Sequence, residues 1–329
     1  MRVGMNPQKQ GKRIELKSNH RIVIVAYIPS LEGYYANVFE VFKLCVASAN
    51  ATKNSACELT LVNNGSCKEV TDYINTLYES NEVNCVIHHK ENIGKMDAMI
   101  GAARMAREAF VTLSDIDILF TTGWQEEVEA LFHTIPNVGS VSPISVRAAH
   151  SYATFSSLSK IILKKVKFNY EVIKENFESH NRFLESINWE KEEDENLKWP
   201  VVSYGNKKAI LGSSHQILTI KRELLFSYVP IEPSLTLVGN LSEYRYIDLP
   251  IDLSNKMRLA TYTNFAYHMG NTVEDWMLKV QKENMVTNTN TESIDRHYSG
   301  TEIKNYETVY YKIKKRIVKK IFKLFYSNK

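Results

Sequence analysis

Several features that would assign a protein to a familiar class are missing from this chain of 329 residues. No apolar run approaches the roughly 18 to 20 residues that a membrane-spanning helix requires. Residues 1–20 form a polar leader without the apolar centre of a secretory signal. We therefore expect a cytosolic protein with neither a spanning helix nor a cleaved signal.

Cysteine and phosphate-binding glycine motifs are also scarce. The four cysteines form no C-x-x-C pair and have no histidine at zinc-finger spacing, which predicts free thiols in a reducing compartment. No G-x-G-x-x-G follows the first predicted strand, and G-x-x-x-x-G-K-[ST] is absent throughout. These absences exclude the common dinucleotide and P-loop sites.

Charge is unevenly distributed along the chain. The net charge is +4, yet residues 302–329 contain nine basic and two acidic residues, so residues 1–301 are slightly acidic. A nucleic-acid groove across the body is therefore not expected, and the basic character is confined to one short segment.

Apolar strands alternate with helical patterns in the first half of the chain. The segment 21–27 (RIVIVAY) has the β-branched content of a strand that is buried on both faces. Further strands are predicted at 58–62, 84–88, 109–113 and 138–141, and helices at 36–50, 68–78, 95–107 and 124–133. This alternation predicts an α/β fold with a mixed, mostly parallel sheet flanked by helices.

The rest of the chain has a less regular pattern. We expect a nucleotide-binding half at 21–145 and an acceptor-binding half at 146–280, with a mostly helical insert near 145–200 and a strand-like segment at 258–268. A polar linker is expected at 281–301 and a basic helix at 302–329.

The residues that follow the predicted strands are polar. Parallel sheets bind ligands at the carboxyl ends of their strands, so these loops are the candidate site. The sharpest feature is Asp115-Ile116-Asp117, which comes directly after the strand 109–113. Two carboxylates on alternate residues can hold a hard divalent cation, and that cation would in turn bind a diphosphate.

Four spaced motifs together resemble family 2 glycosyltransferases of the GT-A fold. They are IVIVAYIPS, LTLVNNGS, NIGKMDA and SDID, and the resemblance covers about residues 21–145. It implies a nucleotide-diphospho-sugar transferase fold, a nucleoside-diphosphate sugar as donor, and Mn²⁺ or Mg²⁺ as cofactor. The implied donor contacts are Tyr27, Pro29, Asn63, Asn92, Gly94, Lys95 and Asp115. The implied metal ligands are Asp115, Asp117 and His268.

The chain departs from the pattern of this family at several positions, among them Cys67-Lys68, where Thr-Asp is frequent. Asn63 stands where an aspartate is usual, although its carbonyl can still accept the imide N–H of uracil. The acidic pair of the second half is broken up within 243–249 (EYRYIDL), which leaves Asp248 and Glu243 as rival general bases. The Asp248-Leu249 step resembles the family pattern and favours Asp248.

The C-terminal segment has the pattern of a basic amphipathic helix. Apolar residues from Val309 onward recur at three-to-four spacing, and lysines and Arg316 occupy the other faces. We expect this helix to bind an anionic membrane surface at the inner face of the membrane. A helix packed on the body and a nucleic-acid contact are the alternatives.

The predicted function is metal-dependent transfer of a sugar, from a UDP-sugar for preference, to an acceptor hydroxyl with inversion. Two alternatives are a nucleotidyltransferase of related fold and a degenerate GT-A protein that binds nucleotide or glycan without turnover. The membrane helix favours a glycan or lipid-linked acceptor from surface-polysaccharide assembly. Trp189 and Trp199 could stack on a sugar ring, although packing is the expected role for both.

Overall fold

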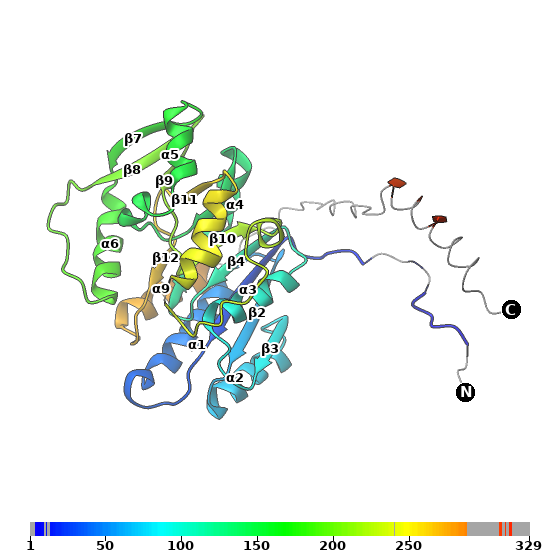
Figure 1. Ribbon diagram of the computed structural model, residues 1–329. Coiled ribbons are helices and arrows are strands. Elements are labelled where there is room, and N and C mark those ends of the chain that lie inside the picture. Colours follow the sequence, from blue (N-terminus) through cyan, green and yellow to red (C-terminus); the bar gives the residue numbers. More distant parts are fainter. Residues whose placement is uncertain are drawn as a thin grey trace. The chain divides into compact units, whose positions relative to one another are not determined.

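The computed structural model describes residues 4–9, 11, 14–239 and 241–287, together with residues 309, 310, 313, 316 and 317. Residues 1–294 form one compact unit and residues 295–329 a second. In the first unit, a ten-stranded mixed sheet lies between helices (Figure 1). The α/β class expected from the sequence is therefore confirmed.

The apolar runs of the first half form a parallel four-stranded sheet. Its strands are β1 (His20–Ala26), β2 (Cys57–Asn64), β3 (Cys85–His89) and β4 (Phe110–Ser114), in the order β3-β2-β1-β4. The helices that connect them are α1 (Val38–Thr52), α2 (Lys68–Glu79) and α3 (Lys95–Met105). Along β1, Ile22 and Ile24 belong to one buried cluster, whereas Val23 and Val25 belong to another. Both faces of this sheet are therefore covered, which explains the uninterrupted apolar run.

A strand from much later in the chain completes the centre of the sheet. β10 (Ile217–Lys221) lies antiparallel between β4 and β6 (Val138–Ser142), and β11 (Met257–Thr261) pairs parallel with β6. The helix α4 (Trp124–Thr134) contacts β6. Because β10 sits against β4, the two halves of the chain share one sheet.

The middle segment differs from the mostly helical structure expected at 145–200. It contains η2 (Arg147–Ser151), α5 (Phe155–Ile162), β7 (Lys167–Val172), α6 (Lys174–Ser186) and β8 (Lys198–Tyr204). β7, β8 and β9 (Lys207–Leu211) form an antiparallel meander at the edge of the sheet. β7 is an edge strand with no buried residue, so it lacks the apolar run that would have predicted it.

The two tryptophans of this region have different surroundings. Trp199 is buried on β8, as expected for a packing role, whereas Trp189 is 64% exposed and the packing role expected for it is wrong. Trp189 follows the C-terminal end of α6, in the loop that leads to β8.

The strand-like segment 258–268 divides into two elements. β11 ends at Thr261, and β12 (Ala266–His268) pairs with β5 (Ile118–Phe120) in a separate two-stranded sheet. Between β10 and β11 lie α7 (Leu224–Ser227), the π-helical η3 (Tyr244–Asp248) and α8 (Leu249–Leu253). β12 therefore places His268 opposite Ile118, next to the predicted metal residues.

The helix α9 (Asp275–Thr287) occupies the first seven residues of the segment expected to be a linker. Its Asn284 is buried, donates to the carbonyl of Phe120 at 2.8 Å and accepts from the amide of Thr122 at 3.1 Å. A buried polar residue with satisfied hydrogen bonds gives no apolar pattern, so composition alone suggested a linker.

In the second unit, residues 309, 310, 313, 316 and 317 are helical. The remainder of the amphipathic helix expected at 302–329 lies outside the described residues. Where the structure describes helices, none is long and apolar enough to cross a membrane. All four cysteines are free thiols, as predicted, and burial raises the pKa of the Cys45 and Cys57 thiols.

Candidate active site

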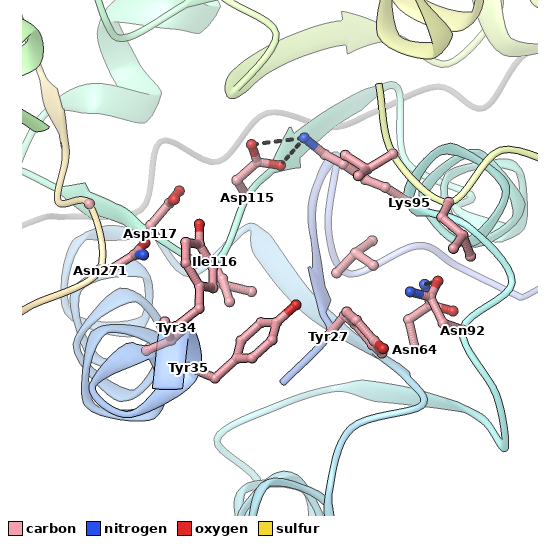
Figure 2. Close-up of a pocket in the computed structure, with 15 residues that line it drawn as sticks. Tyr27, Tyr34, Tyr35, Asn64, Asn92, Lys95, Asp115, Ile116, Asp117 and Asn271 are labelled. Atoms are coloured by element: carbon pink, nitrogen blue, oxygen red, sulfur yellow. Dashed lines mark hydrogen bonds and ion pairs between the residues drawn. The ribbon is translucent and has the colours of Figure 1, made fainter. Parts of the chain in front are cut away.

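A cavity of about 530 Å³ lies at the carboxyl ends of the parallel strands (Figure 2). Its walls come from the loops after β1, β2, β3 and β4 and from two later loops. The lining residues are Val25, Tyr27, Tyr34, Tyr35, Val38, Asn64, Asn92, Lys95, Asp115, Ile116, Asp117, Leu237, Val238, Gly270 and Asn271. Five of the predicted site residues, Tyr27, Asn92, Lys95, Asp115 and Asp117, are among them.

Lys95 connects two carboxylates at this site. Its Nζ lies 2.7 Å from Asp115 Oδ1 and 2.9 Å from Oδ2 (Figure 2). The same Nζ lies 3.6 Å from Glu243 Oε1. Burial alone would lower the pKa of Lys95, but Asp115, Glu243 and Asp117 outweigh it and the pKa is raised. Lys95 is thus a fixed cation at the edge of the cavity, suited to an anionic ligand.

Asp117 has a buried oxygen with no hydrogen-bond partner. Its Oδ1 is buried and unpartnered, while its Oδ2 lies 3.2 Å from His268 Nε2. The other ring nitrogen of His268, Nδ1, lies 2.7 Å from the hydroxyl of Ser186. Burial alone would lower the pKa of His268, but the Asp117 carboxylate raises it. Burying a carboxylate oxygen without a partner costs folding free energy, unless a bound ligand or cation supplies the missing interaction.

The metal site implied by the sequence fits this arrangement in part. Among the described residues, no three or more His, Cys, Asp or Glu side chains gather as a ready cluster for a metal. Asp115 has both oxygens on Lys95, whereas Asp117 Oδ1 and His268 Nε2 remain in position to ligate. These two groups match the oxygen and imidazole donors that Mn²⁺ accepts, and a diphosphate would have to supply further oxygens.

Gly94 shapes the cavity through its backbone. It precedes α3 with a φ of 98°, and a Cβ there would lie 2.3 Å from the carbonyl oxygen of Thr236. The next amide, that of Lys95, donates to the carbonyl of Leu237 at 2.8 Å. Only glycine allows the loop at 236–238 to approach so closely, and this contact places Leu237 and Val238 on the cavity wall.

The two asparagines at the end of β2 have different roles. Asn63 is buried, accepts from the amide of Ser66 at 2.9 Å and donates to the hydroxyl of Thr71 at 2.8 Å, so its amide stabilises the turn. Asn64 lines the cavity and donates to Asn92 Oδ1 at 2.9 Å. The sequence singled out Asn63 as the donor contact, but of the two only Asn64 faces the cavity.

Aromatic residues after β1 form another wall that the sequence analysis missed. Tyr34 and Tyr35 lie in η1 (Gly33–Tyr35), with ring centroids 5.1 Å apart, and Tyr35 lies 6.2 Å from Tyr27 (Figure 2). Tyr34 is 72% exposed, so one ring is free to receive a planar ligand. The Tyr34-Tyr35 pair in the loop between β1 and α1 was the available indication. Pro29, a predicted contact, is exposed outside the cavity wall.

The structure separates the two candidate bases. Glu243 lies beside Lys95, and although burial raises its pKa, a backbone hydrogen bond, Lys95 and Ser242 lower it overall. Asp248 is fully buried in an ion pair with Arg258, which is itself buried. His215 lies 3.5 Å from Asp248 Oδ2. Of the two carboxylates, Glu243 is therefore the one next to the cavity residues.

Solved structures resemble the chain only distantly. A mannosyltransferase from Pyrobaculum calidifontis, in complex with GDP-Man and Mn²⁺, is 15% identical over 70% of this chain and 59% of its own, with a TM-score of 0.38. S. aureus TarS 1–349 in complex with UDP is 11% identical over 82% and 65%, with a TM-score of 0.42. GalNAc-T7 with UDP, GalNAc and Mn²⁺ is 12% identical over 84% and 48%, with a TM-score of 0.47. The chain thus spans less than two thirds of each of these proteins.

No curated protein matches the chain. A family model does match: residues 35–186 fit the one described as glycosyl transferase family 2. The matched range includes Asn64, Asn92, Lys95, Asp115 and Asp117, all of which line the cavity. Residues 35–186, just under half of the chain, therefore match glycosyl transferase family 2.

Proposed function

We propose that this protein is a glycosyltransferase that moves a sugar from a nucleoside-diphosphate donor, with UDP as the favoured nucleotide, to an acceptor hydroxyl. The observation that carries the proposal is the unpartnered buried oxygen of Asp117 at the wall of the strand-end cavity. The cation of a bound diphosphate would give that oxygen a partner, and the diphosphate itself would form an ion pair with the ammonium of Lys95.

The nucleoside end of the donor fits the opposite wall of the cavity. Tyr34 and Tyr35 offer ring faces for a base, and the amides of Asn64 and Asn92 offer donors and acceptors for its edge or for the ribose. We assign to Asn64 the base contact that the sequence suggested for Asn63. The diphosphate would then extend toward Lys95 and Asp117.

Asp117 and His268 are the residues that would hold a divalent cation. When bound, Mn²⁺ or Mg²⁺ supplies positive charge for the leaving diphosphate. Lys95 adds a second positive charge on the same wall, held in place by Asp115. The protein thereby stabilises charge where it develops during sugar transfer.

Glu243 is our candidate for the general base that takes the acceptor proton, with an inverting displacement as the expected course. Its pKa is lowered, so the carboxylate is ionised and able to accept a proton at neutral pH. Asp248 is better suited to positioning, because Arg258 holds it within the buried side of η3. The structural basis for this preference is the 3.6 Å approach of Glu243 to Lys95.

The roles of Glu243 and Asp248 can be separated with two substitutions. Glu243→Gln should abolish most of the rate and leave the melting temperature unchanged. Asp248→Asn should lower the melting temperature, since it leaves Arg258 buried without a charged partner. If Asp248→Asn loses the rate at a temperature where it is folded, while Glu243→Gln retains it, the two assignments must be exchanged.

Calorimetric titration with UDP and Mn²⁺ tests the donor site directly. Asp117→Ala should weaken UDP binding at least about tenfold and remove its dependence on Mn²⁺. Asp72→Ala is the matched control, because Asp72 is an exposed aspartate on α2. Equal affinity of Asp117→Ala and the wild type would refute the proposed donor site. Release of pyrophosphate from a nucleoside triphosphate would instead indicate a nucleotidyltransferase.

The acceptor proposal depends on membrane association. We propose a glycan or lipid-linked acceptor of surface-polysaccharide assembly, because the basic pattern at 302–329 favours attachment to the inner membrane surface. Vesicle flotation of the full chain, with and without charge reversal at Lys314 and Lys315, measures this contribution. Flotation that is independent of these lysines would remove the basis for that acceptor class.

A further inference from the structure

The helix α5 is inverted relative to an ordinary surface helix. Its polar residues Ser156, Ser157 and Lys160 are buried, whereas Phe155 and Ile162 are 77% and 78% exposed. A surface helix normally turns its apolar stripe toward the core. The reversed orientation leaves the most apolar side of α5 facing outward.

Hydrogen bonds on the inner side fix this orientation. The carboxylate of Asp252 accepts from the amides of Phe155 at 3.1 Å and Ser156 at 2.6 Å and so caps the N-terminus of α5. Ser157 Oγ accepts from the amide of Arg258 at 3.1 Å, and Lys160 Nζ donates to Asn255 Oδ1 at 2.9 Å. Rotating the helix to bury its apolar side would break all of these bonds.

A basic cluster continues the exposed apolar side. Lys164, Lys165 and Lys167 follow α5 directly and are exposed, and the segment 155–167 contains no acidic residue. We define the α5 surface as the exposed side chains of this segment together with an exposed leucine of the adjoining α8. Its members are Phe155, Leu158, Ile162, Leu163, Lys164, Lys165, Lys167 and Leu253.

We propose that the α5 surface docks on an anionic lipid bilayer. Exposed apolar side chains next to lysines are the combination that gains from both acyl burial and anionic headgroups. A second copy of the chain is a poorer occupant, because a twofold contact would bring the same lysines together. A helix that only faces solvent would expose Ser156 and Ser157 and bury its apolar residues, which is the opposite of what α5 does.

The α5 surface begins close to the candidate active site. Tyr152, three residues before Phe155, packs on Tyr244 with ring centroids 5.4 Å apart, and Tyr244 adjoins Glu243. A bilayer bound at α5 would therefore lie near the carboxylate assigned as the base. This docking goes beyond the proposed function, because a bilayer could bind the α5 surface whichever donor the active site takes.

Quenching by brominated lipid tests whether α5 enters the bilayer. The full chain carrying Phe155→Trp is bound to phosphatidylcholine vesicles with about one third phosphatidylglycerol, with or without brominated acyl chains. We expect the fluorescence added by the substitution to shift to the blue and to be quenched. Tyr204→Trp, on the exposed end of β8, is the matched control and should show neither effect. Attachment through any other segment would leave the tryptophan introduced at position 155 unquenched and would overturn the proposal.

Partitioning measurements test the same surface without a probe. Ile162→Ser combined with Leu163→Ser should lower the vesicle partition coefficient about tenfold. Lys164→Glu combined with Lys165→Glu should lower it by a similar factor on anionic vesicles only. Met105→Ser combined with Met285→Ser, two hydrophobic positions of similar exposure elsewhere, should have no effect. Unchanged partitioning of both α5 variants, or a solution dimer that they abolish, would refute bilayer docking.

Discussion

The parallel strands β1 to β4 and the antiparallel meander β7 to β9 occupy the same sheet but serve different ends. Every parallel strand ends in polar residues that reach or support the cavity, whereas the meander lies at the far edge of the sheet. In the first region, the cavity is lined by polar side chains such as Asp117, whose Oδ1 has no partner, and we expect such groups to contribute little to stability. In the second region, the burial of large side chains contributes stability. The meander supplies none of the described residues that line the cavity. Substitutions in the two regions should therefore have separable effects.

The largest effect is expected from Asp117→Asn in the cavity. We expect kcat to fall about 10³-fold, equivalent to about 4 kcal/mol in activation free energy, because the amide is a much weaker partner for a cation. The melting temperature should stay within about 2 °C of the wild type, because Oδ1 of Asp117 has no hydrogen bond to lose and the asparagine oxygen can still accept from His268. Steady-state kinetics and calorimetry check this. A destabilised variant would contradict the separation of roles.

Trp199→Ala in the meander should have the opposite outcome. Trp199 is buried in a cluster with Ile173, Leu197, Val201 and Ile210, so its truncation should cost about 3 to 4 kcal/mol of unfolding free energy. Urea denaturation measures that cost. The KM for donor should not change at temperatures where the variant is folded. A changed KM would couple the meander to the cavity.

Glu108→Gln should lower the unfolding free energy by about 2 to 3 kcal/mol at neutral pH. Burial raises the pKa of Glu108, but its hydrogen bonds and charge pairing with Arg21 prevail and lower it to about 2 from an ordinary 4.5. The stabilisation is therefore complete above about pH 4.5 and is lost as the pH falls through 2. Wild type and variant should converge in urea denaturation across that range. A difference that is constant from pH 5 to pH 2 would exclude this carboxylate as the cause.

A smaller effect is expected at the aromatic wall. Tyr34→Ala should weaken UDP binding about tenfold, because it removes an exposed ring face beside Tyr35, and should leave kcat largely unchanged. Calorimetric titration measures the affinity. Tyr34→Phe is the control and should bind nearly as well as the wild type. A tenfold loss in the phenylalanine variant would indicate a hydroxyl contact instead of ring packing.

The smallest effect is expected at Trp189. This side chain is 64% exposed, so Trp189→Ala should change the unfolding free energy by less than about 0.5 kcal/mol. Comparison with Trp199→Ala in the same urea experiment uses the same residue type in the same region. A loss of acceptor affinity without a loss of stability would support the stacking role considered from the sequence.

The first half was predictable because its structure is local in sequence. The apolar run at 21–27 and the Asp115-Ile116-Asp117 triplet predicted β1 and the cavity edge from neighbouring residues alone. The insertion of β10 beside β4 joins residues about 100 positions apart, and no local periodicity encodes such a pairing. The pair Asp248 and Arg258 is likewise recognisable only after folding. The orientation of α5 depends on buried hydrogen bonds. A hydropathy pattern alone would predict the opposite orientation, with the apolar residues buried.

The position of β10 has a consequence for synthesis on the ribosome. Strand β4 pairs with β10 along its whole length, and the amide of Asp115 donates to the carbonyl of Gln216 at 2.9 Å, next to β10. A nascent chain that has emerged only as far as β6 therefore exposes one edge of β4 and lacks the bond that positions Asp115. Under the proposed function, nucleotide binding then awaits translation of about two thirds of the chain. Until that point, the exposed edge of β4 is where chaperone binding or mispairing would occur.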